Sequence, residues 1–98
     1  MQSATDETAL PVKTVRVGYT RGDMLPTFGN LVEVECHALL RSGFAYWTIT
    51  KPEHTGVLAV FGEGPNQLRV RARVVQCKVA EHNGRLRTLV TCQFIGRV

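Results

Sequence analysis

The sequence predicts an all-β domain, a six- to seven-stranded antiparallel β-barrel without substantial helix. The clearest sign is a hairpin over residues 67–95, whose two arms alternate apolar and polar residues as strands with one face on a core do. Asn83 and Gly84 tolerate positive φ and are typical of a tight hairpin turn. The apolar phase changes at Val74 and Val75, which predicts a bulge or sharp bend. Strongly bent strands close small sheets into barrels.

Shorter apolar runs, separated by Gly-, Pro- and Asp-containing loops, precede the hairpin and predict four more strands. They are expected at residues 12–19, 30–37, 43–50 and 57–61, with residues 38–42 as a short connection. In the second strand, alternation places Val32, Val34 and Cys36 inward. Glu33 and Glu35 are then expected on the outer face. Several short strands with regular turn signals are typical of a sandwich or barrel.

The hairpin arms are expected to present an apolar inner face and a basic outer face. Leu68, Val70, Ala72 and Val74 are predicted to face inward from the first arm, and Leu86, Val90, Cys92 and Phe94 from the second. The outward set contains five arginines, Arg69, Arg71, Arg73, Arg85 and Arg87. A basic stripe on a small barrel suits a nucleic-acid backbone, which is one interpretation of this surface.

Length and composition indicate one domain. The chain has 98 residues, of which 44% are hydrophobic, so a modest single core is feasible. Residues 1–10 are interpreted as a polar flexible tail and residues 11–98 as the barrel. No stretch approaches the roughly 18 apolar residues that suggest a membrane span. The polar N-terminus resembles neither a signal nor a transit peptide, so we expect a cytoplasmic protein or a cytoplasmic piece of a larger one.

Charge favours an anionic partner, although only mildly. The chain has 12 Lys and Arg against 8 Asp and Glu, and arginine outnumbers lysine nine to three. Arginine suits bidentate contacts with phosphate and carboxylate groups.

Enzyme chemistry is not indicated, and we expect no catalytic residue, metal or cofactor. The sequence lacks GxSxG, HExxH and a phosphate-binding glycine loop. Glu33 and Glu35 share a strand face, where acids are usually solvated. The cysteines Cys36, Cys77 and Cys92 are odd in number and far apart, which argues against disulfides or a zinc site and favours structural thiols.

Two segments carry a resemblance to a known family. They are LLRSGFAYWTI at the predicted turn after residue 38, and VRARVVQCKV with GRLRTLVTCQFIG in the hairpin. Over most of residues 12–96 the chain resembles the PilZ family of bacterial cyclic di-GMP receptors. The resemblance implies a β-barrel that acts as a non-catalytic signalling module and binds cyclic di-GMP.

The family's binding motifs map onto this chain only in part. In Asp/Asn-x-Ser-x-x-Gly, Gly43 matches the glycine, whereas Ala38 and Leu40 occupy the two polar positions. The family's arginine pair is separated by three residues, and the nearest pair here, Arg16 and Arg21, is separated by four.

The resemblance therefore implies a nucleotide site at the barrel rim. Its predicted ligand-binding residues are Arg16, Arg21, Arg41, Ser42 and Gly43. Two alternatives stay open, a nucleotide-independent adaptor for a protein partner and the nucleic-acid interpretation, which is weaker. For the adaptor, Trp47, Val57 and Phe61 form the predicted exposed apolar patch.

Overall fold

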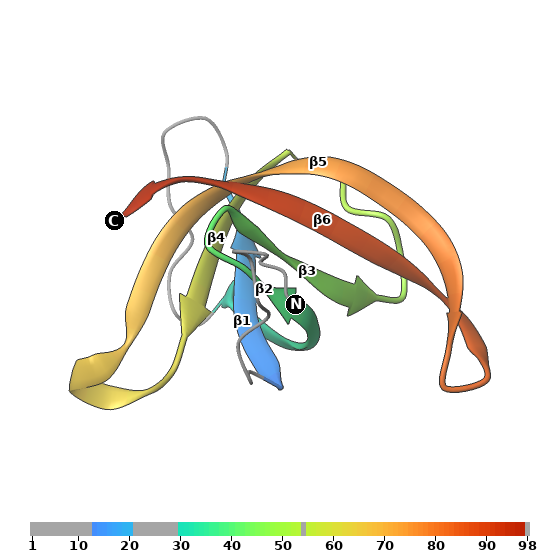
Figure 1. The fold of residues 1–98 in the computed structure, drawn as a ribbon, viewed down its shortest axis with the longest axis horizontal. Coiled ribbons are helices and arrows are strands. Elements are labelled where there is room, and N and C mark those ends of the chain that lie inside the picture. Colours follow the sequence, from blue (N-terminus) through green and yellow to red (C-terminus); the bar gives the residue numbers. More distant parts are fainter. Residues whose placement is uncertain (1–12, 21–29, 54, 98) are drawn as a thin grey trace, which may run out of the picture.

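The computed structural model of the chain describes residues 13–20, 30–53 and 55–97. They form one closed antiparallel barrel of six strands in the order β1-β2-β3-β6-β5-β4 (Figure 1). The strands are β1 (Thr14–Tyr19), β2 (Val32–Leu39), β3 (Gly43–Thr48), β4 (Gly56–Phe61), β5 (Leu68–His82) and β6 (Arg85–Arg97). The predicted barrel is thus confirmed with six strands. The predicted tail over residues 1–10 lies outside the described residues.

Helix is minimal in the described part of the chain. A 3-10 turn, η2 (Gly64–Asn66), joins β4 to β5, and it follows Gly62, whose φ of 78° suits glycine. In the described residues no helix is long and apolar enough to cross a membrane.

The hairpin forms as the sequence predicts, but it is longer. Its turn is reduced to Asn83 and Gly84, whose φ values are 53° and 79°. Both central residues having positive φ is the signature of the type I′ turn, which matches strand twist. The pairing register shifts between Val74 and Gln76, so Val75 is the predicted bulge. A second register shift falls between Arg71 and Ala72.

The barrel interior is filled by inward residues from all six strands. Val15, Val57, Ala59 and Val90 are at most 2% exposed, as alternation along their strands requires. Three phenylalanines cluster within this core: Phe44 is 5.4 Å from Phe61 and 5.8 Å from Phe94, measured between ring centroids. Edge-to-face and offset arrangements of this kind stabilise a core beyond area burial alone.

Two expectations about inward residues are wrong, and both concern ends of strands. Val32 lies at the start of β2 and is 61% exposed, while Leu86 lies beside the hairpin turn and is 71% exposed. The phase of each strand is as predicted, since Cys36 and Val90 are buried. Leu86 pairs only with Glu81 on the ribbon beyond the barrel wall, and Val32 is the last residue of β2 that pairs with β1, at the end of the wall.

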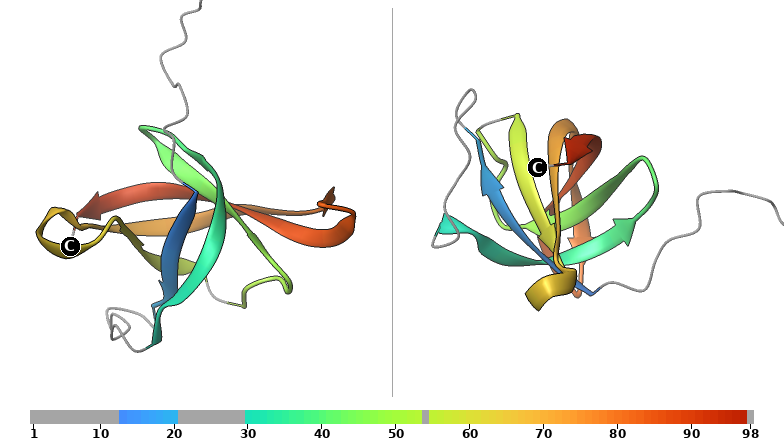
Figure 2. Two further views of the ribbon diagram at one scale, coloured as in Figure 1. Left: turned by 90° about the horizontal axis from the view of Figure 1, so that it is seen from below. Right: turned by 90° about the vertical axis from the view of Figure 1, so that its left-hand side faces the viewer.

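The long hairpin overhangs the barrel. β4 pairs with β5 only from Leu68 to Arg73, and β3 pairs with β6 only from Thr88 to Gln93. Beyond these limits β5 and β6 pair with each other as a two-stranded ribbon. Figure 2 shows this ribbon arching across the barrel and twisting as it extends past it. The twist brings the hairpin tip back against the outer face of β2 and β3.

Candidate ligand-binding site at the hairpin tip

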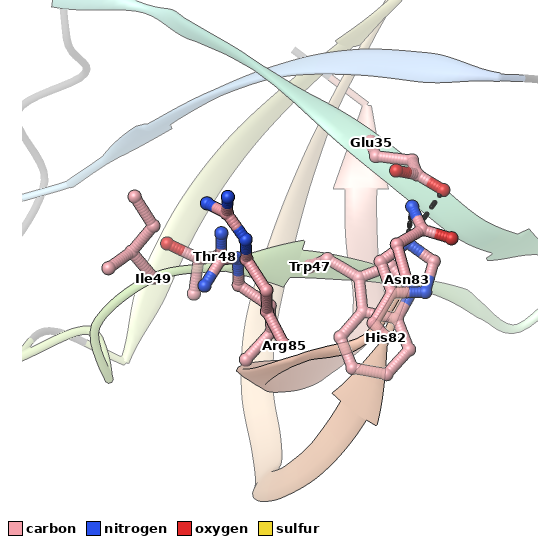
Figure 3. A pocket seen from close by; sticks show the side chains of 8 residues that line it. Glu35, Trp47, Thr48, Ile49, His82, Asn83 and Arg85 are labelled. Carbon is pink, nitrogen blue, oxygen red and sulfur yellow. Dashed lines mark hydrogen bonds and ion pairs between the residues drawn. The ribbon is translucent and has the colours of Figure 1, made fainter.

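A pocket lies where the hairpin tip meets the outer face of β2 and β3. Its volume is about 390 Å³, within the ordinary range for small-molecule sites. Its walls are Glu35, Trp47, Thr48, Ile49, His82, Asn83, Arg85 and Arg87 (Figure 3). Three elements therefore contribute: β2, the end of β3, and both sides of the hairpin turn.

Trp47 forms the centre of this pocket. As a strand neighbour of Tyr46 it points outward, because successive side chains of a strand face opposite sides. His82 stacks flat on it, with centroids 4.3 Å apart and an interplanar angle of 9°, and His37 meets it edge-on at 5.5 Å. This cover reduces the exposure of Trp47 to 9%. Among the described residues, its Nε1 is the one buried side-chain nitrogen or oxygen without a hydrogen-bond partner.

His82 is held in place by Glu35. Its Nε2 lies 2.9 Å from Glu35 Oε2 and 3.4 Å from Asn83 Nδ2. Because the carboxylate accepts only, Nε2 carries the proton and donates it to Glu35, so Asn83 cannot donate to the same nitrogen. Cys36 of β2 pairs with Tyr46 of β3, so the preceding residue Glu35 lies beside Trp47. From this position Glu35 reaches His82, which is stacked on Trp47.

The remaining charges in the pocket are positive. Arg85 pairs across the turn with His82, and Arg87 pairs with Ala80, so both side chains lie on the face that carries the Trp47 stack. Figure 3 shows Arg85 near Thr48 and Ile49, on the other side of Trp47 from Glu35. Arg87 Nη1 donates to Leu86 O at 3.0 Å. The pocket thus combines two guanidinium groups with flat rings, which suits a ligand with phosphates and bases.

The chain matches no family model, no curated protein and no solved structure.

Of the predicted rim residues that the structure describes, Arg41, Ser42 and Gly43 lie together at the turn into β3, whereas Arg16 lies apart in β1. Arg16 pairs with Glu33 of β2 and donates through Nη2 to Gly62 O at 3.0 Å. Arg16 therefore lies beside the start of β2, whereas Arg41 is exposed in the turn that follows the end of β2 at Leu39. The length of β2 between these two positions is about 20 Å. Ser42 beside Arg41 is exposed, and its carbonyl accepts from Phe94 N–H at 2.9 Å. Arg21 lies outside the described residues.

Gly43 has a structural reason to be glycine. A Cβ at this position would lie 2.0 Å from Cys92 O, so the backbones of β3 and β6 approach too closely for any side chain. The sequence suggested that this glycine admits a ligand. In the structure, the group that approaches it is the neighbouring strand.

The predicted arginine stripe is divided in two. Arg69, Arg71 and Arg73 lie on β5 beside β4, and Arg73 donates to Gln93 Oε1 at 2.9 Å. Arg87 of β6 pairs with Ala80, which lies seven residues beyond Arg73 along β5. This separation corresponds to about 23 Å of strand. The two groups of arginines therefore serve different parts of the surface.

The predicted apolar patch is wrong. Trp47, Val57 and Phe61 are 9%, 1% and 5% exposed, because Val57 and Phe61 face the core and His82 covers Trp47. Within the described residues, the large apolar side chains that are exposed are Val32, Ile49, Val75, Val79, Leu86 and Ile95.

The cysteines are buried or half-buried free thiols. Burial raises the pKa of Cys92 to about 12 and also raises that of Cys36, so neither is a thiolate at neutral pH. In the described parts of the chain, no group of three His, Cys, Asp or Glu residues is placed to hold a metal ion.

Sequence reasoning singled out Trp47, Arg85 and Arg87 separately, but it did not join them. It missed Glu35 and His82 as members of one site. Glu35 and His82 are 47 positions apart, and only the twist of the hairpin brings them together. An NG turn flanked by histidine and arginine is a usable signal that a hairpin tip carries polar function, but it does not say what the tip contacts.

Proposed function

We propose that this chain is a non-catalytic, PilZ-like signalling module that binds cyclic di-GMP in the hairpin-tip pocket. The observation that carries the proposal is the arrangement of Arg85 and Arg87 around the Trp47–His82 stack. The guanidinium groups suit the phosphates, and the outer face of His82, whose side chain is 23% exposed, suits a guanine ring. The family resemblance supplies the choice of nucleotide.

The orphan donor at Trp47 supports the same site. A buried N–H without an acceptor costs about 1–3 kcal/mol, and a ligand oxygen that reaches it would recover that free energy. The proposed location in the cell follows from the ligand. Cyclic di-GMP acts in the cytoplasm of bacteria, and the three cysteines of the chain are all free, as expected of a reducing compartment.

Titration calorimetry with cyclic di-GMP tests the proposal. Arg85→Ala and Arg87→Ala should each weaken binding about 10- to 100-fold, since each removes charge-assisted hydrogen bonds worth roughly 1.5–3 kcal/mol. Arg97→Ala is the matched control, because it removes the same charge from the exposed far end of β6. If the wild-type chain shows no binding, the nucleotide is wrong.

The same titration separates this pocket from the predicted rim site. Arg41→Ala should leave affinity unchanged if the ligand binds at the hairpin tip. If Arg41→Ala or Arg16→Ala weakens binding while Arg85→Ala does not, the ligand occupies the rim and the tip pocket is rejected. Nucleic acid is less well supported because the five arginines are divided. Backbone binding would also show a steep loss of affinity with salt, by a slope set by the phosphate contacts.

A further inference from the structure

We propose that the free edge of β5 is a docking site for an extended peptide with alternating acidic and apolar side chains. This surface adjoins the nucleotide pocket and shares Arg87 with it, but the proposal does not depend on the nucleotide. The occupant would add a strand to the overhanging ribbon, which is a known mode of peptide recognition.

The first argument is the unpaired backbone. In the described residues, β5 pairs with β4 only as far as Arg73, and Val74 N–H then donates to Thr55 O at 2.7 Å. Among the strands that the structure describes, β6 is the one that pairs with β5 from Gln76 to His82. An unpaired strand edge is a template for another chain, and natural proteins usually shorten or cover it. Here the edge continues from the bulge to the hairpin turn.

The second argument is which backbone groups face outward. In a two-residue hairpin, His82 and Arg85 flank the turn and direct their N–H and C=O groups toward each other. Backbone direction alternates along an antiparallel strand, so the same groups of Cys77, Val79 and Glu81 point away from β6. These three residues supply the hydrogen bonds for an added strand.

The third argument is the chemistry of the two ribbon faces. One face carries Lys78 and, across the ladder from the small Ala80, Arg87. The other carries Val79 and its diagonal neighbour Leu86, which are 66% and 71% exposed, with the exposed Glu81 opposite Leu86 at the turn end of this face. A strand placed on the edge presents alternate side chains to these two faces. Charge and hydrophobic complementarity therefore specify acidic residues on one side and apolar residues on the other.

Amide hydrogen exchange on the isotopically labelled full chain tests this directly. The probe is a capped nine-residue peptide of alternating valine and glutamate, and its control alternates valine and lysine. At saturation the first peptide should slow exchange of the Cys77, Val79 and Glu81 amides at least about tenfold. Amides of Gln76 and Lys78, which already face β6, should not change. Uniform slowing, slowing elsewhere or no slowing overturns the proposal.

Two variants sharpen the result. Val79→Pro removes an outward N–H, which an edge strand tolerates, and should weaken peptide affinity about tenfold, whereas Val79→Thr keeps the N–H and should bind. Lys78→Glu should also weaken binding, and the exposed Lys51→Glu, with the same charge change, should not. Lys78→Glu decides the matter if the proline variant does not fold.

The same exchange measurement distinguishes a peptide from a second copy of the chain at this edge. If the same three amides become protected as the protein concentration rises without peptide, a second copy of the chain fills the edge, and the peptide proposal is wrong. No nucleotide is present in these experiments, so their failure leaves the cyclic di-GMP proposal untouched, and the converse also holds.

Discussion

The hydroxyl groups of Tyr19 and Tyr46 lie 2.7 Å apart inside the barrel and form a hydrogen bond between β1 and β3. The two environments differ: Tyr46 is 0% exposed, whereas Tyr19 is only half-buried. Only β2 lies between these strands in the barrel wall, and the pair links them through side chains where they share no backbone ladder. A buried hydroxyl needs such a partner, because it cannot reach water.

We predict that the two phenylalanine substitutions at this pair are unequal. Tyr19→Phe leaves the Tyr46 hydroxyl buried without a partner and should lower the free energy of unfolding by about 1–3 kcal/mol. Tyr46→Phe leaves the half-buried Tyr19 hydroxyl and should cost only about 0.5–1.5 kcal/mol. Denaturant unfolding of the two variants measures the difference. Equal losses, or a larger loss for Tyr46→Phe, would contradict this account of the pair.

Stability should decline in alkaline solution for a related reason. Burial raises the pKa of Tyr46 above its ordinary value near 10 and that of Cys92 to about 12 from near 9. Above pH 9 the unfolded chain therefore loses protons that the folded chain keeps, so rising pH favours unfolding. The free energy of unfolding should fall by about 1.4 kcal/mol per pH unit for each group past its unfolded pKa.

Urea titrations at pH 8, 9.5 and 10.5 measure this decline. The stability contribution is fully present below the unfolded pKa of each group and is lost progressively as pH rises from that value towards the raised pKa of the folded state. Cys92→Ala should make the slope that begins near pH 9 shallower by the Cys92 share, and should leave the share of Cys36, whose pKa burial also raises, and the tyrosine part above pH 10. An unchanged midpoint from pH 8 to 10.5 would show that neither group is protected by burial.

Gly43→Ala is expected to destabilise the barrel. The added methyl group would lie 2.0 Å from Cys92 O, and neither backbone can move without breaking the β3–β6 ladder. Overpacking of this kind costs about 1–3 kcal/mol or more. Gly96→Ala is the control, because a methyl group added there on β6 would have nothing within 4 Å and the φ of Gly96 is not positive. A harmless Gly43→Ala would mean that β3 and β6 are further apart than this contact implies.

Trp47 is the single tryptophan of the chain, so its fluorescence reports whether the hairpin tip shields it from solvent. His82→Ala removes the ring stacked at 4.3 Å, so we expect a red-shifted emission and stronger quenching by acrylamide. His82→Phe keeps a flat ring and should retain the wild-type spectrum, although it loses the contact with Glu35. If His82→Ala leaves the spectrum unchanged, the hairpin tip does not cover Trp47 in solution.

Local patterns predicted the hairpin and the barrel well. Asn83 and Gly84 encode the turn in their own backbone preferences, and the displaced apolar phase at Val75 revealed the bulge. The inner face of each strand followed from alternation, because burial on one side of a pleated strand imposes a period of two. These features depend on residues close together in the sequence.

Burial on the outer face was not predictable in the same way. Leu58 and Val60 alternate with the core residues of β4, yet they are 4% and 1% exposed. Val60 lies between Arg16 of β1 and Arg69 of β5, so its surroundings depend on which strands close the barrel. Trp47 is similar, because its cover comes from a tip whose position follows from accumulated twist. Alternation shows which side chains share a face of one strand, but it does not show which other segments of the chain cover that face.

The place of β6 in the barrel has a consequence for biosynthesis. β3 is followed in the chain by β4, but its neighbour in the wall is β6, through the pairs from Gly43–Gln93 to Thr48–Thr88. During translation, β1 to β4 therefore emerge while two strands of the wall, β5 and β6, are still missing. We expect the closing step to wait until residues 88–93 leave the ribosome, with the hairpin of β5 and β6 formed first from local contacts. Until then the edge of β3 is open to chaperones.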